Sequence, residues 1–382
     1  LVAPSGMAAK ERSRFVTAPM RTAAVANAEK HPWARQQQEA AISAARPWIE
    51  RSDEELWAMV PAQELPRTIY TNEGVIYKGQ KPSCPGCGDA APARYGRSWW
   101  SVSLDEPWKI RCKGCGEIYP KNDFGAFYRT ALDKHGMFRR RLGDRSLLFH
   151  ADHPAPDDSL HGVYVDDGYG MSDPQGKRHD VIAYSCQHAL WRSVQAAIDV
   201  LARAYTLTGD PRDAHKAAVL LDRVSDVYPE MDYLPLHELG FQHSQGGTGQ
   251  GRIEGCIWET RVAQRMARAY DVIFDGIQDD ADLVAFASAK AKEFRLGDKQ
   301  SIEAICRHVE DHLLLEALQS CKDGRISGNT GMTHLSLAVS AIALDRPGVT
   351  EEWLDWLFDP RFPGHRRWHN DPVPRVLVEG LA

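Results

Sequence analysis

Hydrophobic residues recur at helical spacing over much of the second half of the chain. Between residues 190 and 205 they fall three or four positions apart, which is the spacing of one buried helix face. This helix is predicted to end at Gly209, because glycine can cap a helix and the following Pro211 cannot continue one. A second apolar stripe follows at once and ends at Tyr228-Pro229. The short connection predicts an antiparallel helical hairpin.

The same pattern repeats on both sides of this hairpin. In the N-terminal part, a helix is predicted from Pro32 to Ile49, and Ser52 with Glu55 forms a capping box before a shorter helix. Toward the C-terminus, inward-facing stripes are predicted for Trp258–Ile273, Ile302–Leu313, Leu335–Ile342 and a last helix capped by Thr350. Successive helical hairpins indicate a solenoid or a toroid, and the lack of a fixed sequence repeat favours the toroid.

The pattern changes between these helical regions. From Thr68 to about Tyr164 it consists of short β-like runs separated by glycine and proline, including Trp99–Val102 and Trp108–Ile110, and Asp166–Asp180 is predicted to be a loop. The predicted organisation is an N-terminal helical segment (1–67), a β-rich insert (68–165) and toroid helices (166–382). The expected fold class is therefore mainly α, an incomplete (α/α) toroid with a small β-rich insert.

Composition excludes some classes of function. The 382 residues are 43% hydrophobic and 26% charged, as in ordinary globular proteins, and carry a formal net charge of -6. A general nucleic-acid binder would carry a basic excess, so nucleic acid is not an expected partner. The basic run Arg139–Arg141 is predicted to be a solvated face. No apolar stretch is long enough to span a bilayer, and no signal peptide is recognisable at the start.

Four cysteines carry the strongest chemical signal. Cys84 and Cys87 form one CxxC pair, Cys112 and Cys115 form another, and 24 residues separate the two pairs. Short glycine-containing knuckles at this spacing are typical of a zinc ribbon, in which four thiolates bind Zn²⁺ and leave no position for a catalytic water. The prediction is structural zinc, with two disulfides or redox thiols as the alternatives. The remaining cysteines, with no paired spacing, are predicted to be buried hydrophobic residues: Cys186, Cys256, Cys306 and Cys321.

Four segments together resemble the heparinase II/III-type polysaccharide lyases. They are His188–Trp191 continued by Leu201–Pro211, Trp258-Glu259 with Ala269–Asp271, Gly328–Met332 before an apolar helix, and Trp57–Pro66. The resemblance implies an (α/α) toroid followed by a β-sandwich, cleavage of uronic-acid polysaccharides by β-elimination, and a secreted or periplasmic location. It also implies a catalytic tyrosine beyond Ala382, so we expect this chain to be a lyase or the substrate-binding part of one.

A lyase that removes the C5 proton of a uronate must stabilise the charge that develops on the carboxylate. Asn329 matches the family's carboxylate-binding asparagine and precedes a helix whose N-terminus favours an anion. His334, one turn into that helix, is the second catalytic candidate. The alternatives are a helix cap for Asn329 and packing against a neighbouring helix for His334.

The predicted substrate-binding residues can contact a sugar or its carboxylate; they are His188, His243, Arg252, Trp258 and Glu259. The histidines are otherwise surface or capping residues, and Trp258 is otherwise a core residue. Glu254 with Glu259 leaves open a glycoside hydrolase on the same scaffold, although carboxylates five residues apart diverge on a helix. A carbohydrate-binding module without catalysis is the third alternative. The expected partner in each case is an acidic polysaccharide or oligosaccharide.

Overall fold

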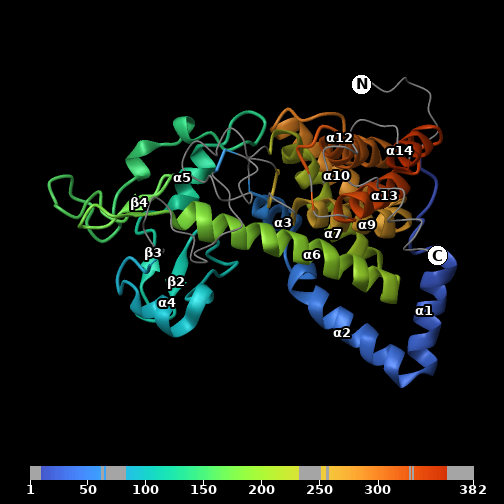
Figure 1. The fold of residues 1–382 in the computed structure, drawn as a ribbon, viewed down its shortest axis with the longest axis horizontal. Helices are drawn as coiled ribbons and strands as arrows, with labels where there is room; N and C mark the ends of the chain where they lie inside the picture. Colours follow the sequence, from blue (N-terminus) through green and yellow to red (C-terminus); the bar gives the residue numbers. More distant parts are fainter. Residues whose placement is uncertain are drawn as a thin grey trace.

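The protein is mainly helical and has two small antiparallel sheets, as a computed structural model shows. The structure describes residues 10–61, 64–65, 83–231, 251–254, 258–326, 328 and 331–358. Two parts lie side by side along the long axis of the molecule (Figure 1). We call residues 83–186 the ribbon lobe, and residues 10–61 with 187–358 the helical lobe. The predicted mainly α class is confirmed at this level.

The ribbon lobe consists of short elements around a small sheet. Strands β1 to β3 pair in sequence order, with Trp100 opposite Cys112 and Ile110 opposite Tyr119. A separate hairpin pairs β4 with β5. The strands are β1 (Trp100–Ser101), β2 (Ile110–Cys112), β3 (Ile118–Tyr119), β4 (Met171–Ser172) and β5 (Arg178–His179), and the α-helices are α4 (Ala90–Tyr95) and α5 (Phe124–Thr130).

The strand predictions for this lobe are only partly correct. The run predicted at Trp108–Ile110 is displaced, because Trp108 packs against Phe124 and Tyr128 and the strand begins at Ile110. The segment predicted as a loop, Asp166–Asp180, contains the β4–β5 hairpin.

The helical lobe contains the long helices. Its elements are α1 (Ala18–Lys30), α2 (Pro32–Ile49), α3 (Asp53–Met59), α6 (Gln187–Thr208), α7 (Pro211–Val227), α9 (Glu259–Ile273), α10 (Ala281–Glu293), α11 (Ile302–Val309), α12 (Glu316–Lys322), α13 (Met332–Leu344) and α14 (Val349–Phe358). The predicted capping box is present, since Ser52 accepts from the Glu55 N–H and Glu55 accepts from the Ser52 N–H. Gly209 caps α6 with a φ of 70°, as its sequence position predicts.

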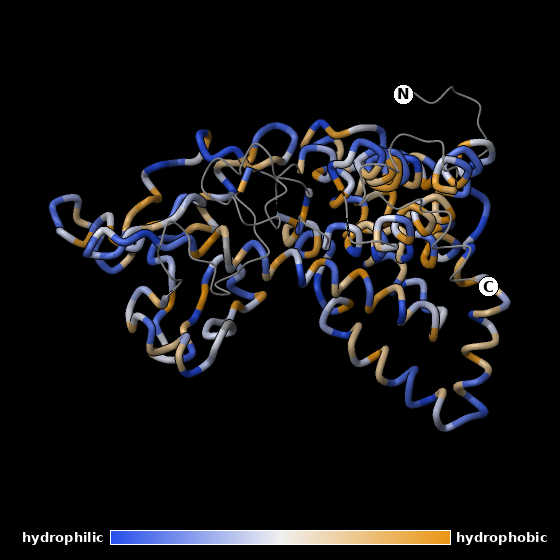
Figure 2. Tube along the Cα trace, viewed as in Figure 1, coloured by the Kyte–Doolittle hydropathy of each residue, from blue (hydrophilic) through white to orange (hydrophobic). Residues whose placement is uncertain are grey.

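The hydrophobic core has two parts, and the continuous helix formed by the π-helix Ile182–Cys186 and α6 contributes to both. Val181, Ile182 and Cys186, just before α6, pack in the ribbon-lobe cluster with Phe124 and Phe138. From Trp191 onward the buried face of α6 belongs to the larger cluster of the helical lobe. Figure 2 shows hydrophobic residues concentrated where the C-terminal helices of that lobe pack together. The long helix therefore fixes the position of one lobe against the other.

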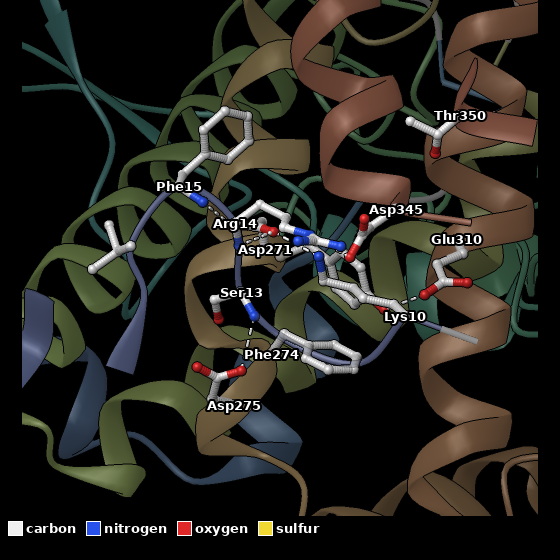
Figure 3. Close-up of polar contacts among 12 residues, drawn as sticks. Lys10, Ser13, Arg14, Phe15, Asp271, Phe274, Asp275, Glu310, Asp345 and Thr350 are labelled. Atoms are coloured by element: carbon white, nitrogen blue, oxygen red, sulfur yellow. Dashed lines mark hydrogen bonds and ion pairs between the residues drawn. The ribbon is translucent and has the colours of Figure 1, made fainter. Parts of the chain in front are cut away.

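An N-terminal segment is held against α9 and the turn that follows it by two carboxylates, of which Asp271 is buried and Asp275 is half-buried (Figure 3). Asp271 accepts hydrogen bonds from the Lys10 ammonium at 2.6 Å and from the backbone N–H of Phe15 at 2.8 Å. Asp275 accepts from the Ser13 N–H at 2.8 Å. The Lys10 and Asp271 side chains are both fully buried, and such a burial is tolerated only because the charges are paired.

Three predictions for individual residues in other parts of the chain are wrong. Thr350 does not cap the last helix, which begins at Val349; its hydroxyl donates to Ala341 O at 3.0 Å. Leu335 is 52% exposed, because α13 turns its neighbour His334 and Leu337 inward instead. In the basic run, Arg139 is not merely solvated, since it pairs with Asp133 and Glu230.

The unpaired cysteines behave as predicted where the structure describes them. Cys186, Cys306 and Cys321 are buried, whereas Cys256 lies outside the described residues. Among the helices described, none combines the length and apolar character needed to cross a membrane.

One half-buried histidine joins three helices of the helical lobe. His215 on α7 bonds through Nδ1 to Asp280, the N-cap of α10, at 2.8 Å and through Nε2 to Asp53 of α3 at 3.1 Å. Burial alone lowers the pKa of His215, but the hydrogen bonds to Asp280 and Asp53 outweigh it and raise the pKa to about 9. The hydrogen bond from His215 in turn lowers the pKa of Asp53 to about 2.

This contact predicts a loss of stability at alkaline pH. The pKa of His215 is higher in the folded than in the unfolded chain, so its contribution is complete below about pH 6.5 and disappears as the pH rises through about 9. Urea denaturation should show wild type losing about 2 kcal/mol more than His215→Gln across that interval. Equal losses in the two proteins would contradict a charged His215 in the folded state.

Candidate functional site

The four paired cysteines of the ribbon lobe converge on one point. Their sulfur atoms all lie within 4.8 Å of one another, with Sγ–Sγ distances of 3.7 Å between Cys84 and Cys115 and 3.8 Å between Cys87 and Cys112. Four sulfurs at about 2.3 Å from a tetrahedral ion lie about 3.8 Å apart. These distances are far longer than a disulfide bond of about 2.05 Å, so the alternative of two disulfides does not describe this arrangement. The four thiols can hold a metal ion.

Two knuckles of the same design place these sulfurs. In each, the glycine after the second cysteine has a positive φ, 59° at Gly88 and 79° at Gly116, and so reverses the chain. The first knuckle is closed by Gly88 N–H donating to Cys84 O at 2.9 Å, and the second by Gly116 N–H donating to Cys112 O at 2.9 Å.

The glycine inside each knuckle has a different purpose. A Cβ added at Gly86 would lie 2.7 Å from the hydroxyl oxygen of Tyr119, and one added at Gly114 would lie 3.0 Å from the Cβ of Ala91. The knuckles therefore need glycine at these positions for close approach to the rest of the lobe, whereas the following glycines supply the turns.

A second polar centre lies in the helical lobe around the carboxylate of Glu259, at the start of α9. This side chain is fully buried. One of its oxygens accepts from the backbone N–H of Arg252 at 3.1 Å and of Glu254 at 2.8 Å. The other lies 3.4 Å from the Tyr228 hydroxyl, and burial followed by the Glu259 charge raises the pKa of Tyr228 well above its usual value. The carboxylate thus fixes the backbone of residues 252–254.

The guanidinium of Arg252 is held in the same centre. It is also fully buried, donates to Tyr228 O at 2.6 Å and to Ser320 Oγ at 2.9 Å, and pairs with Glu316. Arg252 and Glu259 therefore face the protein interior in this structure and shape the segment between them. We call this group, Tyr228, Arg252, Glu259, Glu316 and Ser320, the buried centre.

The segment before α13 lies against the start of α9. A Cβ at Gly328 would lie 3.1 Å from Thr260 Cγ2, and the Gly328 N–H donates to Thr333 Oγ1 at 2.7 Å. The N-cap of α13, Gly331, has a φ of 86° and no side chain to cap the helix. The N-terminus of this helix carries the positive end of the helix dipole, which favours an anion.

The predicted site residues fall into three groups. Arg252, Trp258 and Glu259 are brought together, and His334 lies on α13, which packs against α9. His334 is buried, while Trp258 is half-buried with the Arg261 guanidinium 4.7 Å from its ring. His188 is half-buried in the first turn of α6. Asn329 and His243 lie outside the described residues.

Sequence reasoning missed the residues that complete the buried centre. Tyr228 was predicted only as the end of a helix, and Glu316 and Ser320 lie on α12, 64 and 68 residues beyond Arg252. Gln195 on α6 was also missed; its amide donates to Glu254 Oε1 at 2.8 Å and joins α6 to this region. No local spacing in the sequence identifies contacts over such separations.

Compared with known proteins, the chain matches no family model, no curated protein and no solved structure.

The buried centre predicts a structural consequence for Glu259. Glu259→Ala should lower the free energy of unfolding by about 3–4 kcal/mol in urea denaturation, because it leaves two buried backbone N–H groups without an acceptor. Glu259→Gln is the matched control: its amide oxygen can accept from both N–H groups, so its loss should be about 1 kcal/mol. A stable Glu259→Ala protein would show instead that this carboxylate is not needed for folding.

Proposed function

We propose that the chain is a polysaccharide lyase that cleaves uronic-acid polysaccharides by β-elimination, or the substrate-binding part of one, on a helical lobe built as an incomplete (α/α) toroid. The proposal joins the resemblance to the heparinase II/III-type lyases with one observation. Segments carrying five of the seven predicted catalytic and binding residues belong to elements linked around the start of α9: residues 251–254, α6, α9 with its N-cap Trp258, and α13.

The chemistry requires a carboxylate site beside a base. In β-elimination the C5–H bond and the C4–O bond break, a C4=C5 double bond forms, and the departing oxygen takes up a proton. The start of α13, whose N-cap is a glycine with no capping side chain, supports a role in binding the uronate carboxylate, because the helix dipole favours an anion there. Asn329, two residues before Gly331, is the proposed carboxylate donor, and His334 is the proposed base.

We further propose that the metal of the ribbon lobe is zinc and that it is structural. A set of four sulfurs suits Zn²⁺ or iron, and it fills a tetrahedral coordination sphere. Burial raises the pKa of the Cys84 thiol, so a cation is needed to keep it as a thiolate. Cys84, Cys87, Cys112 and Cys115 would hold the ion, which would supply stability to the lobe and no step of the reaction.

The lyase proposal is tested by incubating the full chain with alginate, heparan sulfate, hyaluronan, chondroitin sulfate and polygalacturonate. Elimination creates a double bond conjugated to the carboxylate, so ultraviolet absorbance should rise with at least one polymer. Asn329→Ala should lower kcat by about 100-fold or more, the usual effect of removing one donor to a developing oxyanion. Asn27→Ala on α1, outside the site, is the control and should leave kcat unchanged.

Other outcomes identify other functions. New reducing ends without ultraviolet absorbance would show a glycoside hydrolase. Binding without cleavage is the result expected of the substrate-binding part of a lyase or of a carbohydrate-binding module, and would show that this chain is not itself the lyase. Full elimination activity in Asn329→Ala would show that this residue is not the carboxylate donor.

The zinc proposal predicts one metal ion per chain. Elemental analysis should find zinc in wild type and in Cys306→Ala, and none in Cys112→Ser, since the latter removes a ligand. Metal removal should cost the ribbon lobe on the order of 10 kcal/mol, while helical circular dichroism should largely persist. Stoichiometric iron in place of zinc, or a metal-free wild type that keeps its proteolytic resistance in residues 83–186, would contradict the proposal.

A further inference from the structure

One buried amide of this protein lacks a partner. Gln187, the first residue of α6, is 1% exposed, and within the described part of the chain neither its Oε1 nor its Nε2 has a hydrogen-bond partner. Burying such a group without a partner is unfavourable, and native proteins satisfy nearly all of them. A methionine of similar length would fill the same space without this penalty. The amide is therefore available to a partner that the described residues do not supply.

A second unsatisfied donor lies one helical turn further along. Trp191 is 2% exposed, and its indole Nε1 likewise has no partner among the described residues. Residues four positions apart share one face of a helix, so the amide and the indole are neighbours on α6. Gln195, at the next turn of that face, is satisfied: it donates to Glu254 at 2.8 Å and accepts from Arg265 at 3.3 Å. The face of α6 that carries both unsatisfied groups therefore also contacts, through Gln195, the segment 251–254, which contains Arg252 of the buried centre.

The backbone departs from regular α-helical geometry just before Gln187. Residues Ile182–Cys186 form a π-helix, and the Gln187 N–H donates to Ile182 O, five residues earlier. Such turns inside a helix occur frequently at functional sites. Gln187 also lies where the ribbon-lobe cluster ends, after Cys186, and before the helical-lobe cluster includes Trp191. Junctions of this kind are preferred places for small-ligand sites.

We propose that Gln187 and Trp191 form a subsite that binds hydroxyl groups of a pyranose ring in the polysaccharide; the identity of this ligand rests on the proposed function. The amide offers two donors and an acceptor, and the indole offers one further donor. Adjacent sugar hydroxyls, each both donor and acceptor, match this set. Neither side chain is charged, so the subsite suits hydroxyls and leaves recognition of the carboxylate to the start of α13.

The test uses the full zinc-loaded chain and Gln187→Met, which keeps the length of the side chain and removes its polar atoms. Without ligand, this variant should melt about 1–3 °C higher than wild type, because an unsatisfied amide is replaced by an apolar group. Its affinity for tetrasaccharides of the cleaved polymer should fall at least tenfold, about 1.4 kcal/mol, by isothermal titration calorimetry. If no polymer is cleaved, tetrasaccharides of all five polymers are the probes.

Gln195→Met is the matched control on the same helix face. It should melt lower than wild type, because it leaves Glu254 and Arg265 without their partner, and should change the affinity less than about threefold. A lower melting temperature for Gln187→Met would mean that internal water satisfies the amide, and an unchanged affinity would mean that no ligand does; either result overturns the subsite. Binding that depends on Gln187 without any elimination would overturn only the lyase.

Discussion

A single helix shared by two hydrophobic cores is the constraint on which the rest of the structure depends. The residues just before α6 pack among the aromatic side chains of the ribbon lobe, and its later turns pack in the helical lobe. Burial of each large apolar side chain along this helix stabilises the fold by about 1.5–3 kcal/mol, so separating the helix from either core would be strongly unfavourable. Because the helix runs without a break from the π-turn into α6, it restricts how the two lobes can move relative to each other. The relative position of Gln187, His188 and the segment at Glu254 follows from that restriction.

Several buried charges in this protein are paired, and a buried neutral amide differs from them in an informative way. Lys299 is fully buried between Asp222 at 2.8 Å and Asp226 at 2.7 Å, and Lys10 is buried against Asp271. The Glu259 carboxylate likewise receives backbone donors. In each case the neighbouring segment is positioned by the charge it satisfies, since an unpaired charge would be far more costly. Against this background, the amide of Gln187 stands out because neither of its polar atoms has a partner among the described residues.

The sequence predicts those parts of the fold that local signals control. The helix from Pro32 to Ile49, the capping box at Ser52 and the end of α6 at Gly209 are found as predicted, because each depends on residues within one or two turns. The cysteine knuckles were predictable for the same reason. The β4–β5 hairpin was missed because its strands have only two residues each, too few to show alternation.

Candidate site residues were harder to interpret than elements, because their role depends on distant partners. Arg252 has the side chain expected of a carboxylate-binding group, yet its guanidinium is used by Tyr228, Ser320 and Glu316. The sequence gives no sign of that, since the partners on α12 lie 64 and 68 residues away. For the same reason, the sequence did not identify Gln187. Its significance depends on the fold, in which its amide has no hydrogen-bond partner among the described residues.

The four-cysteine cluster and the helical lobe are connected through α6, although the cysteines are remote in sequence from the buried centre. Cys84 and Cys112 belong to the same hydrophobic cluster as Ile182 and Cys186, the residues that lead into α6. A metal bound at the four sulfurs would stabilise that cluster and so the packing of the π-turn. The helical lobe keeps its own larger core, so losing the metal should leave most helices intact while releasing the start of α6. Gln187 and His188 would be displaced first. The four cysteines would therefore serve to position one end of the helix that joins the two lobes.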